Sequence, residues 1–165
     1  MSLTSIISKL YFRPRWKELE HYRQGGVALQ NEVLRYLISR GKETEYGQSH
    51  YFPMMKGYED FAKFIPVNTY EELKGDIDRM RHGEKDILWP GEVKWDAKSS
   101  GTTNDKSKFI PVTPEGLKNL HYQGGGDVVA LYLRNHPESH IFEGRSLILG
   151  GSHSPNYDLP NSLVG

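Results

Sequence analysis

The sequence has no cysteine, no net charge and no long apolar run. Without cysteine, disulfides, thiolate metal sites and cysteine nucleophiles are excluded. Lys and Arg together number 21, as do Asp and Glu, whereas a dedicated nucleic-acid-binding protein usually has a basic excess. No stretch approaches the roughly 20 apolar residues that a membrane span needs, and the N-terminus lacks the apolar block of a signal peptide. We therefore expect a soluble, cytoplasmic protein with no nucleic-acid partner and no membrane partner.

Aromatic residues supply much of the area that the chain could bury. Its 165 residues suit one domain of ordinary size, and only 36% of them are hydrophobic. Ten tyrosines and three tryptophans are present, and each such side chain can bury roughly 150–250 Å². A packed core is therefore feasible despite the polar composition.

The first part of the chain predicts helices. Residues 2–24 carry an apolar stripe at helical spacing, which Pro14 should break or restart. Residues 27–40 give a second helix, for which Gly41 is a plausible C-cap. A polar and aromatic connection with short helical turns follows.

A third helix is expected in the stretch TYEELKGDIDRMRHG, with Asn68 or Thr69 as its N-cap and Gly83 as its end. Arg79, Arg81 and His82 then form the solvated end of this helix, where cations suit the helix dipole.

After residue 85 the pattern becomes α/β. Alternating residues predict a strand near 92–97, SGTTND a turn, and KFIPV a second strand over 108–112. Thr113 and Pro114 start a helix that runs to about Arg134, and the three glycines at 124–126 either break it or allow a close backbone approach. RSLILGG, residues 145–151, reads as a third strand. We predict an α/β fold: a helical N-terminal segment, 1–85, followed by strand, loop, strand, helix and strand over 86–165.

The stretch SSGTTNDKSK, residues 99–108, has two interpretations. Four hydroxyl residues around one glycine, followed by two lysines, could surround a phosphate, since glycine admits a close backbone and the other groups donate hydrogen bonds or charge. The same residues could form an ordinary polar hairpin. The stretch is not a Walker loop and lacks the dinucleotide fingerprint G-x-G-x-x-G.

Other motifs give weaker evidence for a functional site. His136 and His140 have a metal-like spacing, but Pro137 makes a helical ligand pair unfavourable, so we predict no metal site. Gly150–His153 follows the expected third strand and could form the wall of a site at a sheet edge. Ser152 and His153 lack the G-x-S-x-G elbow of a hydrolase. No catalytic residue is assigned.

The segment WDAKSSGTTNDKSKFIPVT resembles the phosphate-binding motif of the adenylate-forming superfamily. More narrowly, it is similar to the corresponding segment of the auxin-responsive acyl-acid amido synthetases, the Gretchen Hagen family, and of their bacterial relatives. Upstream, FIPVNTYEELKGDIDRMRHGEKDILWPGEVKW resembles the same family, and downstream NHPE and ILGGSH fit its bacterial branch. The resemblance extends over essentially the whole chain.

This resemblance implies a ligase that acts in two steps. A carboxylic acid attacks ATP to give an acyl-adenylate and pyrophosphate, and an amino acid then displaces AMP to form an amide. ATP and Mg²⁺ are the implied cofactors, and the acid and the amino acid are the implied small-molecule partners. The family's loop maps onto Ser99, Ser100, Gly101, Thr102 and Thr103, which would hold the β- and γ-phosphates.

The resemblance also assigns roles beside the loop. Lys106 and Lys108 would neutralise the departing pyrophosphate. Asn104 stands where the superfamily often has glycine, which leaves open how tightly the loop closes. Within the helix 114–134, which helps line the acid pocket in the family, the substrate-binding candidates are His121, Tyr122 and Gln123; Ser152 is a further candidate.

Family members are longer than this chain, so the resemblance implies the N-terminal part of an adenylation domain, without its C-terminal portion and mobile domain. We expect this fragment to be inactive alone and to self-associate through an exposed sheet edge. Two alternatives stay open: an acyl-CoA ligase-like enzyme, and a non-catalytic α/β module that binds an anion or a protein.

Overall fold

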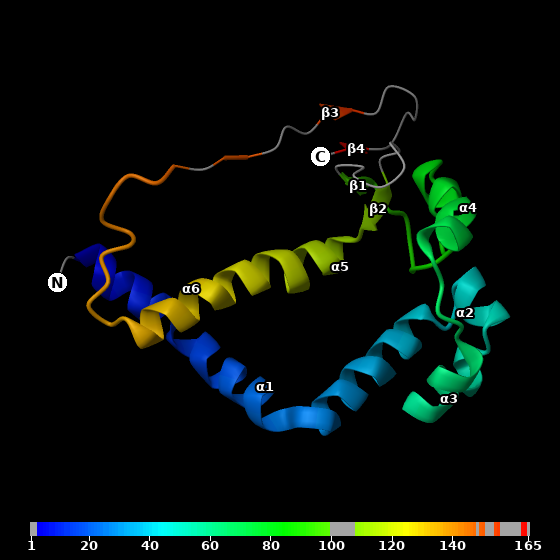
Figure 1. The fold of residues 1–165 in the computed structure, drawn as a ribbon, viewed down its shortest axis with the longest axis horizontal. Helices are drawn as coiled ribbons and strands as arrows, with labels where there is room; N and C mark the ends of the chain where they lie inside the picture. Colours follow the sequence, from blue (N-terminus) through cyan, green and yellow to red (C-terminus); the bar gives the residue numbers. More distant parts are fainter. Residues whose placement is uncertain (1–2, 100–107, 148, 151–153, 156–162, 165) are drawn as a thin grey trace. The chain divides into compact units, whose positions relative to one another are not determined.

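The computed structural model describes residues 3–99, 108–147, 149–150, 154–155 and 163–164 (Figure 1). The chain divides into two compact units. The first unit comprises residues 1–29 and 115–150, and the second comprises residues 30–114 and 151–165. Each unit is described by itself.

Helix α1, Leu3–Gly41, runs from the first unit into the second. The predicted break at Pro14 is wrong, since helical structure continues through the proline. The interruption lies instead at Gly26, where φ is 48° and ψ is −134°. Glycine reaches this left-handed region without the steric penalty of a Cβ atom, and the position coincides with the boundary expected between the helices 2–24 and 27–40.

In the first unit, the start of α1 packs against a second helix. Residues 114–135 form α5 (Pro114–Gly116), the π-helical turn η2 (Leu117–Tyr122) and α6 (Gln123–Asn135). This confirms the predicted helix and shows that its three glycines do not break it. Ala130 and Leu133 of α6 are buried, and the indole Nε1 of Trp16 donates to the carbonyl oxygen of Ala130 at 2.9 Å.

In the second unit, four short helices follow α1: α2 (Glu45–Ser49), η1 (Phe52–Met54), α3 (Tyr58–Phe64) and α4 (Tyr70–Arg81). Thr69 caps α4 in a capping box with Glu72, which confirms the predicted start of this helix. The amide groups of Glu45 and Tyr46 donate to the carbonyl oxygens of Asp86 and Ile87. The start of α2 is thereby tied to the segment that follows α4, where Met80, Ile87 and Val93 form a buried cluster.

A small sheet completes the second unit, with the strand order β2-β1-β4-β3. Strand β1 (Trp95–Lys98) pairs antiparallel with β2 (Phe109–Val112), so that Lys98 lies opposite Phe109. Strand β4 (Leu163–Val164) runs parallel to β1 and antiparallel to β3 (Ser154–Pro155). The two predicted strands around the 99–108 stretch are thus confirmed, although the first begins at Trp95 rather than at residue 92.

The strand predicted over 145–151 is wrong for its described residues. Residues 145–147 and 149–150 belong to neither a helix nor a strand. Leu147 and Leu149 are 90% and 91% exposed, so these two side chains are not packed as they would be in a buried strand. The expected arrangement of a helical segment followed by a small sheet is nevertheless confirmed.

Candidate functional site

The stretch that the sequence assigns to phosphate binding connects β1 to β2. Its two described ends, Ser99 and Lys108, are paired across the hairpin. The amide of Ser99 donates to the carbonyl oxygen of Lys108 at 2.9 Å, and the amide of Lys108 donates to Ser99 Oγ at 3.0 Å. Ser100, Gly101, Thr102, Thr103 and Lys106 lie outside the described residues, as does Asn104.

Helix α4 contacts the β2 end of this hairpin. The amide of Phe109 donates to the hydroxyl of Tyr70 at 3.0 Å, and the guanidinium of Arg81 lies 3.6 Å from the centre of the Phe109 ring. The ammonium of Lys108 lies 5.3 Å from the centre of the Tyr70 ring. One side chain from each end of α4 therefore reaches the same residue of β2.

The predicted substrate-binding residues lie at the junction of η2 and α6, in the first unit. His121 and Tyr122 are exposed, and their rings meet edge to face with centroids 5.5 Å apart. With its amide oxygen turned toward Arg15, Gln123 accepts hydrogen bonds from both terminal nitrogens at 2.9 and 3.0 Å. Gln123 therefore binds α1 in this structure, while Ser152 lies outside the described residues.

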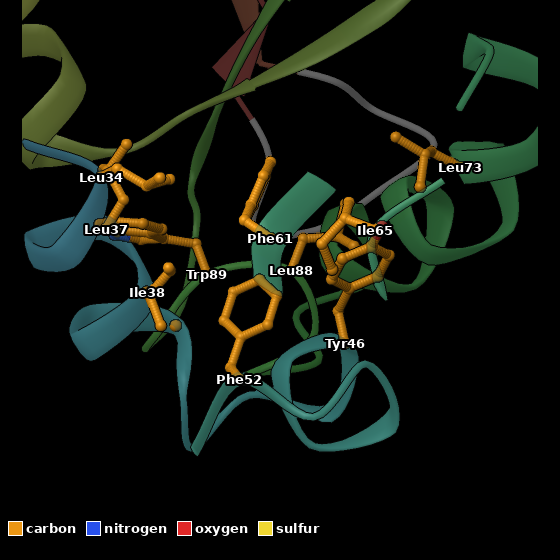
Figure 2. Close-up of a pocket in the computed structure, with 11 residues that line it drawn as sticks. Leu34, Leu37, Ile38, Tyr46, Phe52, Phe61, Ile65, Leu73, Leu88 and Trp89 are labelled. Carbon is orange, nitrogen blue, oxygen red and sulfur yellow. The ribbon is translucent and has the colours of Figure 1, made fainter. Parts of the chain in front are cut away.

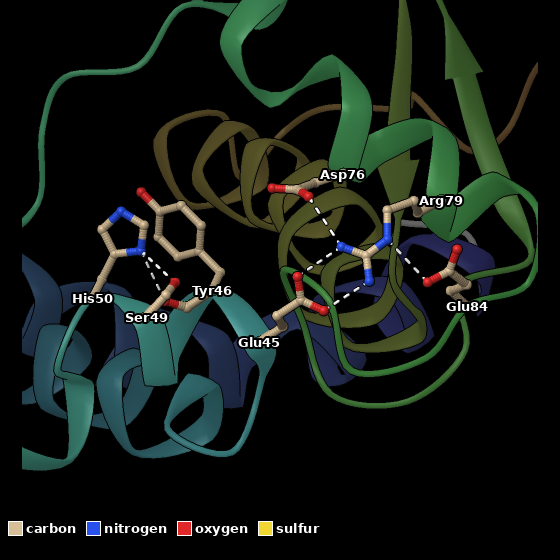
Figure 3. Close-up of polar contacts among 7 residues, drawn as sticks. All are labelled: Glu45, Tyr46, Ser49, His50, Asp76, Arg79 and Glu84. Carbon is tan, nitrogen blue, oxygen red and sulfur yellow. Dashed lines mark hydrogen bonds and ion pairs between the residues drawn. The ribbon is translucent and has the colours of Figure 1, made fainter.

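A cluster around Arg79 was missed by the sequence analysis, which placed this residue at a solvated helix end. Figure 3 shows its guanidinium directed at three carboxylates: Glu45 at 2.7 Å, Glu84 at 2.9 Å and Asp76 at 3.4 Å. The hydrogen bonds from Arg79 lower the pKa of Glu45 below its ordinary value. The same figure shows His50 of the neighbouring turn, whose Nδ1 lies 2.9 Å from the carbonyl oxygen of Tyr46.

An apolar cavity of about 360 Å³ was also missed (Figure 2). None of the residues that line it is charged, and only long-range folding brings them together, so no local pattern could have indicated it. They are Leu34, Leu37, Ile38, Gly41, Tyr46, Phe52, Phe61, Ile65, Leu73, Leu88 and Trp89. The Tyr46 hydroxyl accepts a hydrogen bond from Asn68 at 3.0 Å. The lining side chains are aliphatic or aromatic, so the cavity offers mainly apolar contact.

Within the described residues there is no group of three His, Cys, Asp or Glu side chains that could hold a metal ion. His136 and His140 face separate acids, Glu138 at 3.5 Å and Glu143 at 2.7 Å. A search of the described helices likewise finds none with the length and apolarity of a membrane span.

Solved structures with a similar fold are known. The structure of AtGH3.15 acyl acid amido synthetase in complex with 2,4-DB matches with a TM-score of 0.77 at 27% identity, over 90% of this chain and 26% of that one. A second structure, of GH3.15 acyl acid amido synthetase, matches with a TM-score of 0.75 at the same identity and coverage. The predicted fold class is therefore confirmed.

Curated relatives agree with the structural match. The indole-3-acetic acid-amido synthetase GH3.15 of Arabidopsis thaliana is 32% identical over 121 residues, which is 73% of this chain and 20% of the relative. The 4-substituted benzoates-glutamate ligase GH3.12 of the same plant is 28% identical over 107 residues, 64% of this chain and 18% of the relative. The chain thus spans about a fifth of the length of these relatives.

The model of the GH3 family N-terminal domain matches residues 15–157. The match includes the hairpin with its 99–108 stretch, helix α4 beside it, and the helix 114–135. Since it covers well over half of the sequence, this chain belongs to the GH3 family.

Proposed function

We propose that the intact protein activates a carboxylic acid with ATP as an acyl-adenylate and then joins the acyl group to an amino acid. The observation that carries this proposal is the hairpin. Residues 99–108 connect two paired strands, with Ser99 and Lys108 bonded to each other at the base. A phosphate chain requires several donors that converge on it, and the hydroxyl, glycine and lysine residues of this stretch are of the types that could supply them.

In this proposal Ser99, Ser100, Gly101, Thr102 and Thr103 bind the β- and γ-phosphates. Lys106 and Lys108 offset the charge that develops on the leaving pyrophosphate. In the same proposal Mg²⁺ arrives with ATP and is bound mainly by the phosphates.

The acid is proposed to lie against the η2–α6 junction, with His121, Tyr122, Gln123 and Ser152 as contact candidates. The π-helical turn supports this, because such turns often occur at functional sites. The names of the relatives suggest the class of substrate: aromatic acids such as indole-3-acetic acid and 4-substituted benzoates, with an amino acid such as glutamate as acceptor.

Four finer expectations remain proposals. The relatives are several times longer, so residues 1–165 are proposed to be the N-terminal part of an adenylation domain that is inactive alone. The bacterial-branch resemblance stays a prediction, since GH3.15 and GH3.12 are both plant proteins. Cytoplasmic location and self-association through a sheet edge also stay predictions.

The test is pyrophosphate–ATP exchange by the intact protein over a panel of aromatic acids. We expect exchange that depends on the acid, followed by amide formation when amino acids are added. Transfer of the acyl group to coenzyme A instead would favour the acyl-CoA ligase-like alternative. Nucleotide binding with no exchange for any acid would favour a non-catalytic module and overturn the proposal.

A further inference from the structure

The first residue of β2 has its backbone amide turned away from β1. In an antiparallel pair, hydrogen-bonded and non-hydrogen-bonded residue pairs alternate. Ser99 and Lys108 form a bonded pair at the base of the hairpin, so Lys98 and Phe109, the next pair, do not bond to each other. The amide of Phe109 therefore points to the outer edge of the sheet, where the Tyr70 hydroxyl accepts it at 3.0 Å.

This hydrogen bond gives the outward-facing amide of the edge strand β2 an acceptor. Two residues along the strand, the next outward position is Pro111, which has no amide hydrogen to offer. Tyr70 and Pro111 together leave β2 without an outward amide donor over Phe109–Pro111. The hydroxyl of Tyr70 is thus a specific anchor for the point where β2 begins, one residue after the end of the 99–108 stretch.

The side chain of Phe109 is held by the other end of α4. The guanidinium of Arg81 stacks on its ring at 3.6 Å, and the Arg81 side chain is only 12% exposed. Its Nε lies 3.7 Å from Oδ2 of Asp96, a buried residue of β1. Arg81 therefore contacts both strands of the hairpin, and a planar, weakly hydrated guanidinium suits this stacked position better than an ammonium would.

Tyr70 also contacts Lys108, one of the residues predicted to bind phosphate. The ammonium of Lys108 lies 5.3 Å from the centre of the Tyr70 ring, within the range of a cation–π contact. Tyr70 thus contacts Lys108 with its ring and Phe109 with its hydroxyl, at consecutive residues.

We propose that Tyr70 and Arg81 are positioning residues for nucleotide binding: they fix the β2 end of the hairpin so that Lys108 can contact the β- and γ-phosphates of ATP. The inference rests on the proposed function. Neither residue touches the nucleotide; both act through Phe109 and Lys108. Removing either anchor should weaken binding of a nucleotide that carries these two phosphates and spare one that lacks them.

The test compares dissociation constants of ATP and AMP for the intact protein by calorimetry. Tyr70→Phe removes only the hydroxyl and should raise the dissociation constant of ATP about 3- to 10-fold, the affinity equivalent of one net hydrogen bond. The value for AMP should stay within about 1.5-fold, and the KM for ATP should rise while the KM for the acid does not. Arg81→Lys, which keeps the charge but loses the planar stack, should act in the same direction.

Tyr46→Phe is the matched control. It also removes a tyrosine hydroxyl that accepts one hydrogen bond, from Asn68, but its ring lines the apolar cavity. We expect it to leave the ratio of the ATP and AMP constants unchanged. If Tyr70→Phe and Tyr46→Phe change this ratio equally, or if Tyr70→Phe weakens ATP and AMP binding alike, the positioning role is refuted.

Failure of this inference is distinguishable from failure of the proposed function. If Thr102→Ala weakens ATP binding while Tyr70→Phe and Arg81→Lys do not, the stretch binds phosphate without the α4 anchors, and only the inference falls. If Thr102→Ala also leaves ATP binding unchanged, residues 99–108 do not bind the phosphates, and the proposed function is contradicted at this point.

Discussion

Arg79 donates two parallel hydrogen bonds to Glu45, which precedes it by 34 residues: Nη1 to Oε1 and Nη2 to Oε2, each 2.7 Å long. This two-point pairing connects α4 to the start of α2, and Nε of the same guanidinium binds Glu84 beyond the end of α4 at 2.9 Å. Parallel pairs of this kind fix orientation as well as distance. Arg79 therefore joins three parts of the second unit that are separate in sequence.

The first prediction concerns the pH dependence of this pairing. The hydrogen bonds from Arg79 lower the pKa of folded Glu45 below its ordinary value of 4.5. A carboxylate whose pKa is lowered by folding stabilises the protein above the unfolded pKa, and this contribution is lost as the pH falls through the folded pKa. Glu45→Gln should therefore lower the urea midpoint near neutral pH and make no difference well below pH 4.5.

The control for this measurement is Glu43→Gln. Glu43 is 77% exposed and forms a long ion pair with its neighbour Lys42, at 3.9 Å, so the substitution removes the same charge without removing a partner of Arg79. An equal loss of stability in both variants at neutral pH would mean that general charge, and not the pairing with Arg79, is responsible. High salt should reduce the effect of Glu45→Gln, since both partners are partly exposed.

The second prediction contrasts two helical glycines. A Cβ atom built on Gly47 in α2 would lie 2.0 Å from the carbonyl oxygen of Gly41, whereas one on Gly75 in α4 would meet nothing within 4 Å. Gly47→Ala should lower the free energy of unfolding by about 3 kcal/mol, at the upper end of overpacking effects, since backbone must move. Gly75→Ala should raise it by about 0.5–1 kcal/mol through helix propensity.

Urea denaturation of the two glycine variants measures whether each substitution lowers or raises the free energy of unfolding. A neutral Gly47→Ala would show that the turn between α1 and α2 relaxes freely, which would contradict the tight contact with Gly41. A destabilising Gly75→Ala would mean that this face of α4 is packed against something.

The third prediction concerns the pair that joins α1 to α6. Arg15 donates to both carboxylate oxygens of Asp127 at 2.7 and 2.8 Å, and the two side chains are 20% and 18% exposed. Asp127→Asn should lower the free energy of unfolding by about 1–2 kcal/mol, less than a fully buried charged pair would lose. Glu18→Gln removes the other carboxylate that binds Arg15, but Glu18 is 56% exposed, so it should have little effect. An equal loss of stability in both variants would mean that the pairing of Arg15 with Asp127 of α6 contributes no more than the exposed pairing with Glu18.

The sequence predicted local structure well where a local mechanism sets it. The capping box of Thr69, the start of a helix at Pro114 and the hairpin strands around residues 99–108 all depend on neighbouring residues, and all are confirmed. The glycines at 124–126 stay helical although each lowers helix propensity, because buried residues farther along α6 pack and offset the loss.

Features that need distant residues escaped the sequence analysis. The apolar cavity draws its walls from α1, α2, α3, α4 and the segment after α4. Arg79 and Glu45 form their hydrogen bonds across 34 residues, and Tyr70 and Phe109 form theirs across 39 residues, so both contacts require the folded chain. Pro14 was misjudged for the same reason: Arg15 and Trp16 contact α6, and such tertiary contacts can hold a helix through a residue that would otherwise break it.

The last prediction concerns the phosphate-binding stretch itself. In the intact protein, Ser99→Ala or Thr102→Ala should lower the rate of adenylate formation about 10²- to 10³-fold, the effect expected when one preorganised donor to a developing charge is lost. Ser99 has a second role, since its Oγ accepts the amide of Lys108 at 3.0 Å, so Ser99→Thr should restore both the hairpin bond and most of the rate. Ser49→Ala is the control, because it removes an exposed hydroxyl whose hydrogen bonds among the described residues are to its near neighbours Tyr46 and His50. Pyrophosphate–ATP exchange measures the rates, and wild-type exchange in both Ser99→Ala and Thr102→Ala would remove this stretch from the mechanism.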